Sequence, residues 1–178
     1  MPIPSFQQYT APSQVTEQVK RALTDCWIEV TNAGGAAGFP FPPIDEKQAA
    51  PAVDKVVNAL SLNTSRLLTA TAGGELIGWL NVRRDPFELI AHWGTLHHVQ
   101  TRPRHQGRGF GAALMNEVRR IARDEMRLEQ LHLAARGGVG LEAFYGRLGW
   151  KEVGRWPGAL RLADGDDRDE VLMHLDPL

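Results

Sequence analysis

The sequence predicts a single α/β domain built around a mixed β-sheet, and three observations support this fold class. A chain of 178 residues with 43% hydrophobic and 23% charged residues has the length and composition of one globular domain. Hydrophobic residues recur at helical spacing in some segments and at every second position in others. No linker or internal repeat divides the chain, so we expect one domain over residues 1–178.

Two helices are predicted near the N-terminus. Residues 13–31 place apolar side chains three and four positions apart, which predicts an amphipathic helix with Ser13 as its N-cap. A second helix is expected over residues 45–60, where Asp45 begins the pattern of a capping box. Pro51 lies inside this segment, and because proline removes a helical hydrogen bond we expect a kink or a fresh start there.

The rest of the chain alternates between strands and helices. Residues 65–84 predict a β-hairpin that turns at Gly73 and Gly74. The acidic segment 162–170 is expected to be a loop between the last two strands. The other predicted elements are a strand over 91–101, a helix from Gly109 to Met126, a strand over 129–135, a helix over 141–149, and strands over 150–156 and 170–175.

Residues 101–115, TRPRHQGRGFGAALM, run from the end of a predicted strand into a predicted helix. The first backbone N–H groups of a helix have no partner within it, and together with the helix dipole they attract phosphate. Glycine at alternate positions lets the backbone approach such a ligand, because no Cβ is in the way. The loop has three arginines at its rim, which would add positive charge: Arg102, Arg104 and Arg108.

Three phosphate-binding motifs compete for this stretch, with a glycine-rich connector that binds nothing as the alternative. A Walker A loop requires Lys-Ser or Lys-Thr after its last glycine, but Phe110 and Gly111 follow here. A dinucleotide fingerprint requires its last two glycines three positions apart, and here they are two apart. The spacing R-x-x-G-x-G remains, and it is matched by Arg104, Gly107 and Gly109.

This third motif lies in VQTRPRHQGRGFGAALM, residues 99–115, which resembles the acetyl-CoA pyrophosphate loop of the GNAT superfamily of N-acetyltransferases. A second segment, LEAFYGRLGWKEVG at 141–154, is similar to the family's Phe-Tyr and Gly-aromatic segment. With the strands around them, these two segments extend the resemblance over about residues 75–156, which would form the CoA-binding core. The segments GGAAGF and VGRWPGALR are also similar to the tabtoxin-resistance branch of antibiotic acetyltransferases.

The resemblance implies a fold and a division of roles. The implied fold is one GNAT-like domain with a mixed, mostly antiparallel, twisted sheet of about six to seven strands, flanked by helices and with splayed central strands. Acetyl-CoA would be the co-substrate, and Tyr145 would donate a proton to the leaving thiolate. The implied cofactor-binding residues are Val99, Gln100, Thr101, Arg104, Gln106, Gly107, Arg108, Gly109, Phe110 and Gly111.

The general base does not follow from the resemblance. Members of the tabtoxin-resistance branch tend to carry an acidic residue at the end of the strand before the second motif, where this chain has Arg136. A histidine accepts a proton near neutral pH, and by the period of two His97 shares a strand face with Val99. We therefore expect His97 to be the base. A β-bulge would exchange it with His98, and Glu142 or a chain of water molecules are further alternatives.

These features predict an acyltransferase that moves the acetyl group of acetyl-CoA directly to a primary amine of a small molecule, through a tetrahedral intermediate. A non-catalytic CoA-binding sensor module and a protein or peptide Nα-acetyltransferase are the alternatives. The acidic segment 162–170 would attract a cationic acceptor, although such segments are usually only solvated. Candidates for lining an acceptor pocket are the glycine-rich segment AGGAAGFPF, residues 33–41, and the aromatic residues Trp27, Phe39, Trp93 and Trp156.

Composition and charge argue against several other classes of function. A net charge of −1 lacks the basic excess of a nucleic-acid-binding protein. With no apparent signal peptide or membrane-spanning segment, we expect a cytoplasmic protein that does not enter a membrane. The single cysteine, Cys26, is expected to be a small core residue, and no metal is expected because His97 and His98 should point to opposite sides of a strand. The protein is expected to be a monomer or a homodimer that pairs through residues 170–175.

Overall fold

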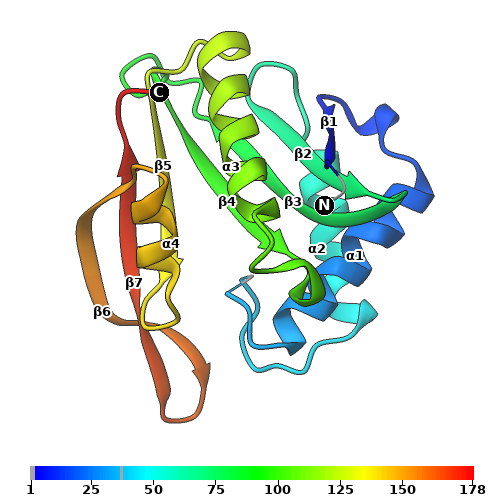
Figure 1. Cartoon of the computed structure of the whole chain (residues 1–178), viewed down its shortest axis with the longest axis vertical. Coiled ribbons are helices and arrows are strands. Elements are labelled where there is room, and N and C mark those ends of the chain that lie inside the picture. The colour runs from blue at the N-terminus through cyan, green and yellow to red at the C-terminus, as the bar shows by residue number, and fades with distance from the viewer. Residues whose placement is uncertain (1–2, 37) are drawn as a thin grey trace.

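The computed structural model describes residues 3–36 and 38–178, and within them a seven-stranded sheet carries helices on both faces (Figure 1). The sheet order is β1-β2-β3-β4-β5-β7-β6. This mixed sheet confirms the predicted α/β fold. The elements are β1 (Ser5–Tyr9), α1 (Glu17–Asn32), α2 (Glu46–Asn58), β2 (Ser65–Ala72), β3 (Glu75–Arg84), β4 (Trp93–Thr101), α3 (Phe110–Arg120) with a π-helical turn (Ile121–Glu125), β5 (Gln130–Arg136), α4 (Leu141–Arg147), β6 (Lys151–Ala163) and β7 (Asp166–Leu175), with short 3₁₀ turns at Pro12–Gln14 and Pro103–His105.

The central strands β4 and β5 are the only parallel pair among the described strands, and they are paired over a short distance. Their register runs from the pair Trp93–Gln130 to the pair Thr95–His132. Beyond this point the two strands separate, and the space between them widens towards the C-terminal end of β4 (Figure 1). The predicted splayed central strands are therefore confirmed, and one edge of β4 is left without a strand partner among the described residues.

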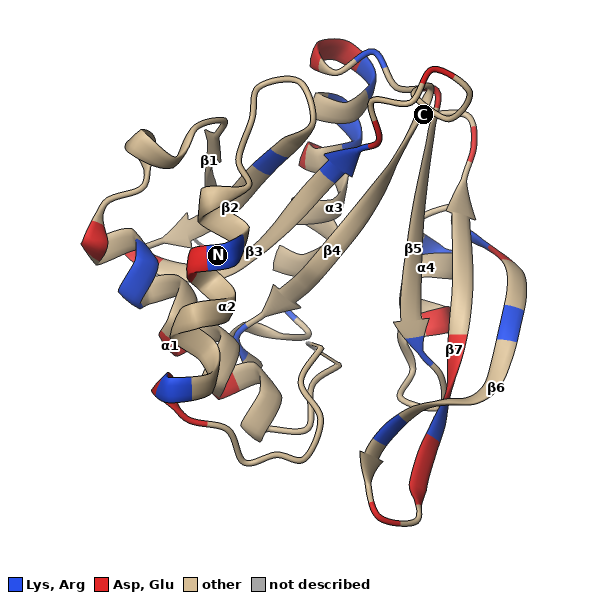
Figure 2. Ribbon diagram, turned by 180° about the vertical axis from the view of Figure 1, so that it is seen from behind, with Lys and Arg blue, Asp and Glu red and all other residues tan. Residues whose placement is uncertain are grey.

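The helices divide the core into two clusters. Helices α1 and α2 cover one face of strands β1–β4, as the view from behind shows (Figure 2), while α3 packs on the opposite face and α4 lies against β5 and β6. Cys26 is buried in the α1–α2 cluster, and burial raises the pKa of its thiol to about 12, which confirms its interpretation as a core residue. None of the described helices is both long and apolar enough to cross a bilayer.

The N-terminal segment differs from the sequence prediction in two ways. Strand β1 was not predicted, because SFQQY lacks the alternation of apolar residues that marks a strand; it forms by pairing along the edge of β2. The predicted N-cap at Ser13 is wrong, since this residue lies in a 3₁₀ turn. Thr16 caps α1 instead, and its hydroxyl accepts a hydrogen bond from the Val19 N–H at 3.3 Å.

The second helix begins as predicted but continues where a break was expected. Asp45 and Gln48 form the reciprocal capping box, with the Asp45 carboxylate accepting from the Lys47 N–H at 2.9 Å and the Gln48 side chain accepting from the Asp45 N–H at 3.1 Å. The helix runs through Pro51 without interruption, so the fresh start is wrong. Pro51 has no N–H to donate to the carbonyl oxygen of Lys47, four residues earlier. Lys47 is exposed, so water can donate to that oxygen instead.

The C-terminal hairpin is longer than predicted. The hairpin of residues 65–84 turns at Gly73 and Gly74 as expected, but the loop expected over 162–170 is mostly strand, with a tight turn at Gly165. Arginines of β6 pair with two of the acidic residues of β7 that suggested a loop: Arg161 with Asp167 at 2.7 Å and Arg155 with Asp169 at 3.2 Å. Strand β7 lies between β5 and β6, so residues 170–175 have both edges occupied and the proposed pairing between chains through them is wrong.

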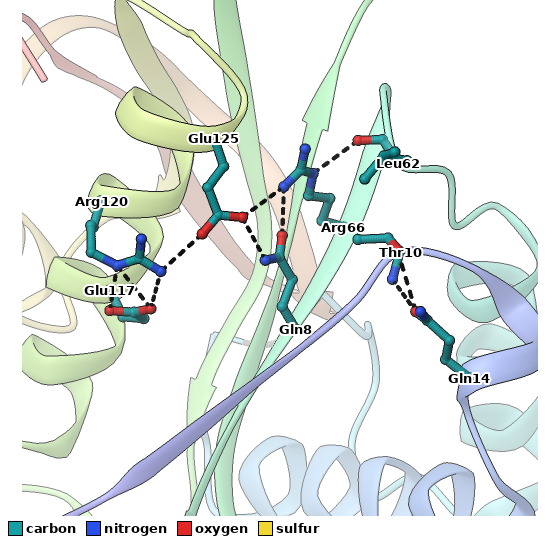
Figure 3. Close-up of polar contacts among 8 residues, drawn as sticks. All are labelled: Gln8, Thr10, Gln14, Leu62, Arg66, Glu117, Arg120 and Glu125. Carbon is teal, nitrogen blue, oxygen red and sulfur yellow. Dashed lines mark hydrogen bonds and ion pairs between the residues drawn. The ribbon is translucent and has the colours of Figure 1, made fainter.

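A buried arginine links the first two strands to the end of α3 (Figure 3). The Arg66 side chain is only 8% exposed, and it donates to the Leu62 carbonyl at 2.9 Å, to Gln8 at 2.8 Å and to Glu125 at 3.1 Å. Glu125 lies on the π-helical turn and also accepts a hydrogen bond from Arg120 at 3.0 Å. The network therefore fastens β1 and β2 to the last turn of α3.

Replacing Glu125 with glutamine should lower the free energy of unfolding by about 1–2 kcal/mol at pH 7, because it leaves the Arg66 charge without its counter-ion. The Gln8 hydrogen bond, and then Arg120, lower the pKa of the Glu125 carboxyl, so its contribution is present above the unfolded pKa and is lost as the pH falls through the folded one. Urea unfolding from pH 7 to pH 3 measures this difference.

The matched control is Glu117→Gln, because Glu117 pairs with the exposed Arg120 at 2.7 Å on the helix surface. Such a pair is expected to contribute only a few tenths of a kcal/mol. Equal destabilisation by the two substitutions, or a difference independent of pH, would show that the buried guanidinium does not depend on Glu125.

Candidate functional site

A cleft of about 640 Å³ occupies the space between β4 and β5. Its walls come from both halves of the sheet, from the helices α3 and α4, and from the loop that follows α1. The residues that line it are Val30, 33–36, Leu96, 98–101, Pro103, Gln106, Gly107, Gly109, Gly111, Ala112, 133–135, Val139, Leu141, Phe144, Tyr145, Arg147 and Leu148.

A row of backbone amides faces this cleft at the start of α3. Gly107 and Gly109 have φ angles of +70° and +82°, a left-handed conformation that suits glycine. Within the described part of the chain, no acceptor satisfies the N–H groups of residues 107–112. The N–H of Gln106 already donates to a carbonyl of the preceding turn at 3.1 Å, so the row begins one residue later than the resemblance implied. Successive N–H groups of this kind at a helix N-terminus bind anions.

Gly111 lies where the two walls of the cleft approach each other. A Cβ at position 111 would come within 3.4 Å of the side chains of Phe144 and Thr101, which belong to opposite walls of the cleft. The unsatisfied amides, with open space beside Gly107 and Gly109, fit the pyrophosphate of coenzyme A, and the cleft between the strands fits its pantetheine arm. Of the residues implied to bind it, the structure brings seven to the lining of the cleft: Val99, Gln100, Thr101, Gln106, Gly107, Gly109 and Gly111.

The other three implied cofactor residues lie elsewhere. Phe110 is buried in the core beneath α3. Arg104 forms ion pairs with Glu29 at 2.7 Å and with Glu75, on the side of the loop nearer to α1. Arg108 is exposed and has no ion-pair partner among the residues described, so it remains the arginine of the loop that is available to a phosphate. These roles stay predictions.

Strand β4 is bulged where it borders the cleft. His98 has a φ of +57°, and the register with β3 shifts between Trp79 and Asn81, so that β4 carries an extra residue. The Gln100 side chain donates to the His98 carbonyl at 3.2 Å and fixes the bulge. Gly78 on β3 is required opposite it, since a Cβ there would lie 2.6 Å from the Gln100 carbonyl oxygen.

The bulge changes which histidine meets the cleft. His98 lines the cleft and packs against Trp27 with ring centroids 4.6 Å apart, whereas His97 is not among the lining residues. The expectation that these neighbours point to opposite sides fails, because their rings lie only 6.0 Å apart. Burial lowers the pKa of each histidine to about 4.

In the described part of the chain, no three metal-ligating side chains form a cluster.

Tyr145 reaches the cleft from helix α4. Its side chain is 5% exposed, and its ring packs between Phe144 and Trp150, with centroid distances of 5.1 and 5.9 Å. No described residue hydrogen-bonds to its hydroxyl. Burial raises the pKa of Tyr145 well above its usual value, so the hydroxyl keeps its proton at neutral pH and can donate it.

Glu142, the other candidate base on this helix, is held outside the cleft. Its carboxylate accepts a hydrogen bond from the Gly138 N–H at 3.2 Å and lies 3.6 Å from the Arg155 guanidinium. It therefore holds the turn that precedes α4 against the first turn of the helix.

A second cavity of about 300 Å³ adjoins the cleft, and the two share Ala36, Ala134 and Ala135. Of the aromatic residues expected in an acceptor pocket, Phe39 lines it, while Trp156 is 58% exposed. The sequence suggested an acidic segment near the acceptor, and Glu170 from that segment does line this cavity, but the sequence did not indicate that Arg136 of β5 would lie opposite it. The lining residues are Ala36, 38–40, 134–136, 159–162 and Glu170.

Comparisons with known proteins agree with this fold. The acetyltransferase (GNAT) family model matches residues 18–150. A GNAT-family acetyltransferase from Streptococcus pneumoniae superposes with a TM-score of 0.74 at 15% identity, covering 99% of this chain and 100% of that chain. Ribosomal-protein-alanine N-acetyltransferase from Brucella melitensis gives 0.71 at 19% identity, covering 97% and 99%. An aminoglycoside 6'-N-acetyltransferase complexed with coenzyme A gives 0.70 at 15% identity, covering 97% and 96%. The family model spans most of the sequence, and the chain therefore belongs to the GNAT family of acetyltransferases.

Proposed function

We propose that this protein transfers the acetyl group of acetyl-CoA to a primary amine of a small molecule. One observation carries the proposal: the unsatisfied amides of residues 107–112 face a cleft between two splayed strands. Acetyl-CoA, when bound, supplies an acetyl thioester that an amine can attack directly. The amides would hold its pyrophosphate, and the free edge of β4 at residues 99–101 would hold the pantetheine arm.

Tyr145 would act as the general acid in this reaction. Its protonated hydroxyl lies in the same cleft as the amide row and is free to donate to the leaving thiolate. His98 would accept a hydrogen bond from the attacking amine. With a pKa of about 4 its imidazole stays neutral at pH 7, so a proton that it takes must pass on to water.

A small acceptor is favoured over a peptide by the second cavity. Its volume of about 300 Å³ suits a small molecule, and the loop after α1 connects to β6 across it through a hydrogen bond from the Phe41 N–H to the Leu162 carbonyl at 2.7 Å. The Brucella relative acts on ribosomal protein according to its name, and a peptide acceptor is therefore the second candidate.

The test is acetyl-CoA turnover with amino acids, aminoglycosides, polyamines and short peptides, followed by thiol release and mass spectrometry. Acetylation of a small amine at a kcat/KM at least tenfold above every peptide is expected. Acetyl-CoA binding without any turnover would identify a sensor module, and the absence of binding would refute the proposal altogether.

The two histidines provide a further prediction. His98→Gln should lower kcat/KM about 10²-fold, the effect of losing a general base, whereas His97→Gln should change it less than about threefold. Because both histidines have a pKa near 4, the wild-type kcat/KM should show no inflection near pH 6.5 and should rise with deprotonation of the acceptor amine. Steady-state rates from pH 5 to 9 measure this. A larger loss in the His97 variant would restore His97 as the base.

A further inference from the structure

The second cavity contains two charged side chains of opposite sign that are not paired with each other. Arg136 ends β5 and Glu170 lies opposite it in the register of β7, so both side chains extend from the same face of the sheet. Among the described residues, neither one has an ion-pair partner within 4 Å. The cavity therefore presents an available guanidinium beside an available carboxylate.

Arg136 is only weakly satisfied where it stands. Its one described hydrogen bond is to the Gly34 carbonyl at 3.5 Å, the outer limit of such a contact. Burial, and then the neighbouring Arg168, lower the pKa of Arg136, and the charge of Asp166 offsets this only in part, so that the surroundings disfavour the cation. A half-buried guanidinium of this kind gains from a bidentate anionic partner.

Two of the acidic residues near the tip of the hairpin already have arginine partners. Asp167 accepts two hydrogen bonds from Arg161 at 2.7 and 2.8 Å, and Asp166 pairs with Arg168. Figure 2 shows basic and acidic residues side by side along β6 and β7. The acidic residues 166 and 167 therefore offer little attraction to a polycation such as an aminoglycoside or a polyamine.

We propose that the acceptor is an amino acid, a primary amine that carries its own carboxylate, and that Arg136 binds this carboxylate. This inference rests on the proposed function, and it names the substrate class of the same site. Glu170 provides the counter-charge for the ammonium group of the incoming zwitterion. The amine end points to the residues that both cavities share, Ala36, Ala134 and Ala135, because the acetyl thioester is reached from there.

The chemical step balances without any further reactant. The deprotonated amine forms a bond to the acetyl carbon, the bond from that carbon to sulfur breaks, the amine proton leaves to solvent, and the thiolate takes a proton. The amino-acid carboxylate is unchanged by the reaction and serves only in binding.

The test compares each of the common L-amino acids with its carboxamide, which lacks the carboxylate but keeps the amine. Wild-type protein should show at least tenfold higher kcat/KM for the best acid than for its amide. Arg136→Gln should lower kcat/KM for that acid about 10- to 100-fold, mainly through KM, and leave the amide within about twofold. Arg161→Gln is the matched control, because Arg161 lines the same cavity but is held by Asp167.

Calorimetry of the same ligands with CoA-saturated protein separates this inference from the proposed function. Tighter binding of the acid than of its amide, lost in Arg136→Gln, supports the inference even if no acetylation occurs, in which case only the proposed reaction fails. Equal rates and equal binding for acids and amides, or a clear preference for aminoglycosides or polyamines, overturn the inference while the acetyl transfer stands. If the Arg136→Gln variant does not fold, the wild-type protein alone tests the inference, through the ratio of kcat/KM for the amino acid to kcat/KM for its carboxamide.

Discussion

Tyr145→Phe is expected to lower kcat by about 10²- to 10⁴-fold while changing the dissociation constant for CoA less than about twofold. The hydroxyl is the one polar group of a side chain that is otherwise packed against Phe144 and Trp150, so its removal should leave the packing intact. Because burial keeps Tyr145 protonated, the lost function is proton donation to the leaving thiolate. Thiol release measures kcat, and calorimetry measures CoA binding.

The chain offers a matched control in its other tyrosine. Tyr9 is equally buried, but it lies on β1 in the cluster beneath α1 and α2. Tyr9→Phe should leave kcat within about twofold. If Tyr145→Phe retained turnover within threefold of the wild type, the proton would have to reach the thiolate from water, and Tyr145 would be a packing residue.

Gly109→Asp is expected to weaken CoA binding at least 100-fold, about 2.7 kcal/mol. It places a carboxylate among the N–H groups that face the cleft, where it repels the pyrophosphate and competes for the same donors. The backbone strain at a φ of +82° is similar for aspartate and asparagine, so Gly109→Asn isolates the charge and should cost at most about tenfold. Titration with CoA measures all three proteins.

Gly165→Asp controls for a charge at a left-handed position elsewhere. Gly165 has a φ of +79° and, like Gly109, open space where a Cβ would be. It turns the β6–β7 hairpin, so CoA binding should be unchanged. Equal losses from the aspartate and asparagine variants at position 109 would mean that loop conformation, and not the anion site, accounts for the effect.

Much of the fold could be predicted because local patterns specify it. The capping box at Asp45, the Gly73–Gly74 turn and the helical period after Gly109 act within a few residues, and the structure contains all three. Strand β1 could not be predicted, because its five residues become a strand only by pairing with β2. The same holds for the long β6–β7 hairpin, where strand pairing and the cross-strand ion pairs of Arg155 and Arg161 outweigh the local preference of acidic residues and glycine for loops.

The candidate site divides in the same way. The row of amides could be predicted from sequence, because the glycine-rich loop leads into a predicted helix and the first N–H groups of any helix have no partner within it. The choice between His97 and His98 depended on a bulge, and Gly78 was a sequence signal for it, because glycine inside a strand often marks a bulge or a close backbone approach. Arg136 and Glu170 gave no such signal, because only the sheet register brings them together.

The separation of β4 from β5 places the two proposed sites on different parts of the sheet, so their sequences can diverge separately. The amide row that we propose as the pyrophosphate site lies on the α3 side of the gap, whereas most of the wall of the second cavity belongs to β5, β6 and β7 on the other side. If both proposed sites are correct, substitutions in β6 and β7 would change the acceptor without altering the residues that bind acetyl-CoA. Two solved structures of this fold, each less than a fifth identical to this chain, are named for different acceptors, a ribosomal-protein alanine and an aminoglycoside.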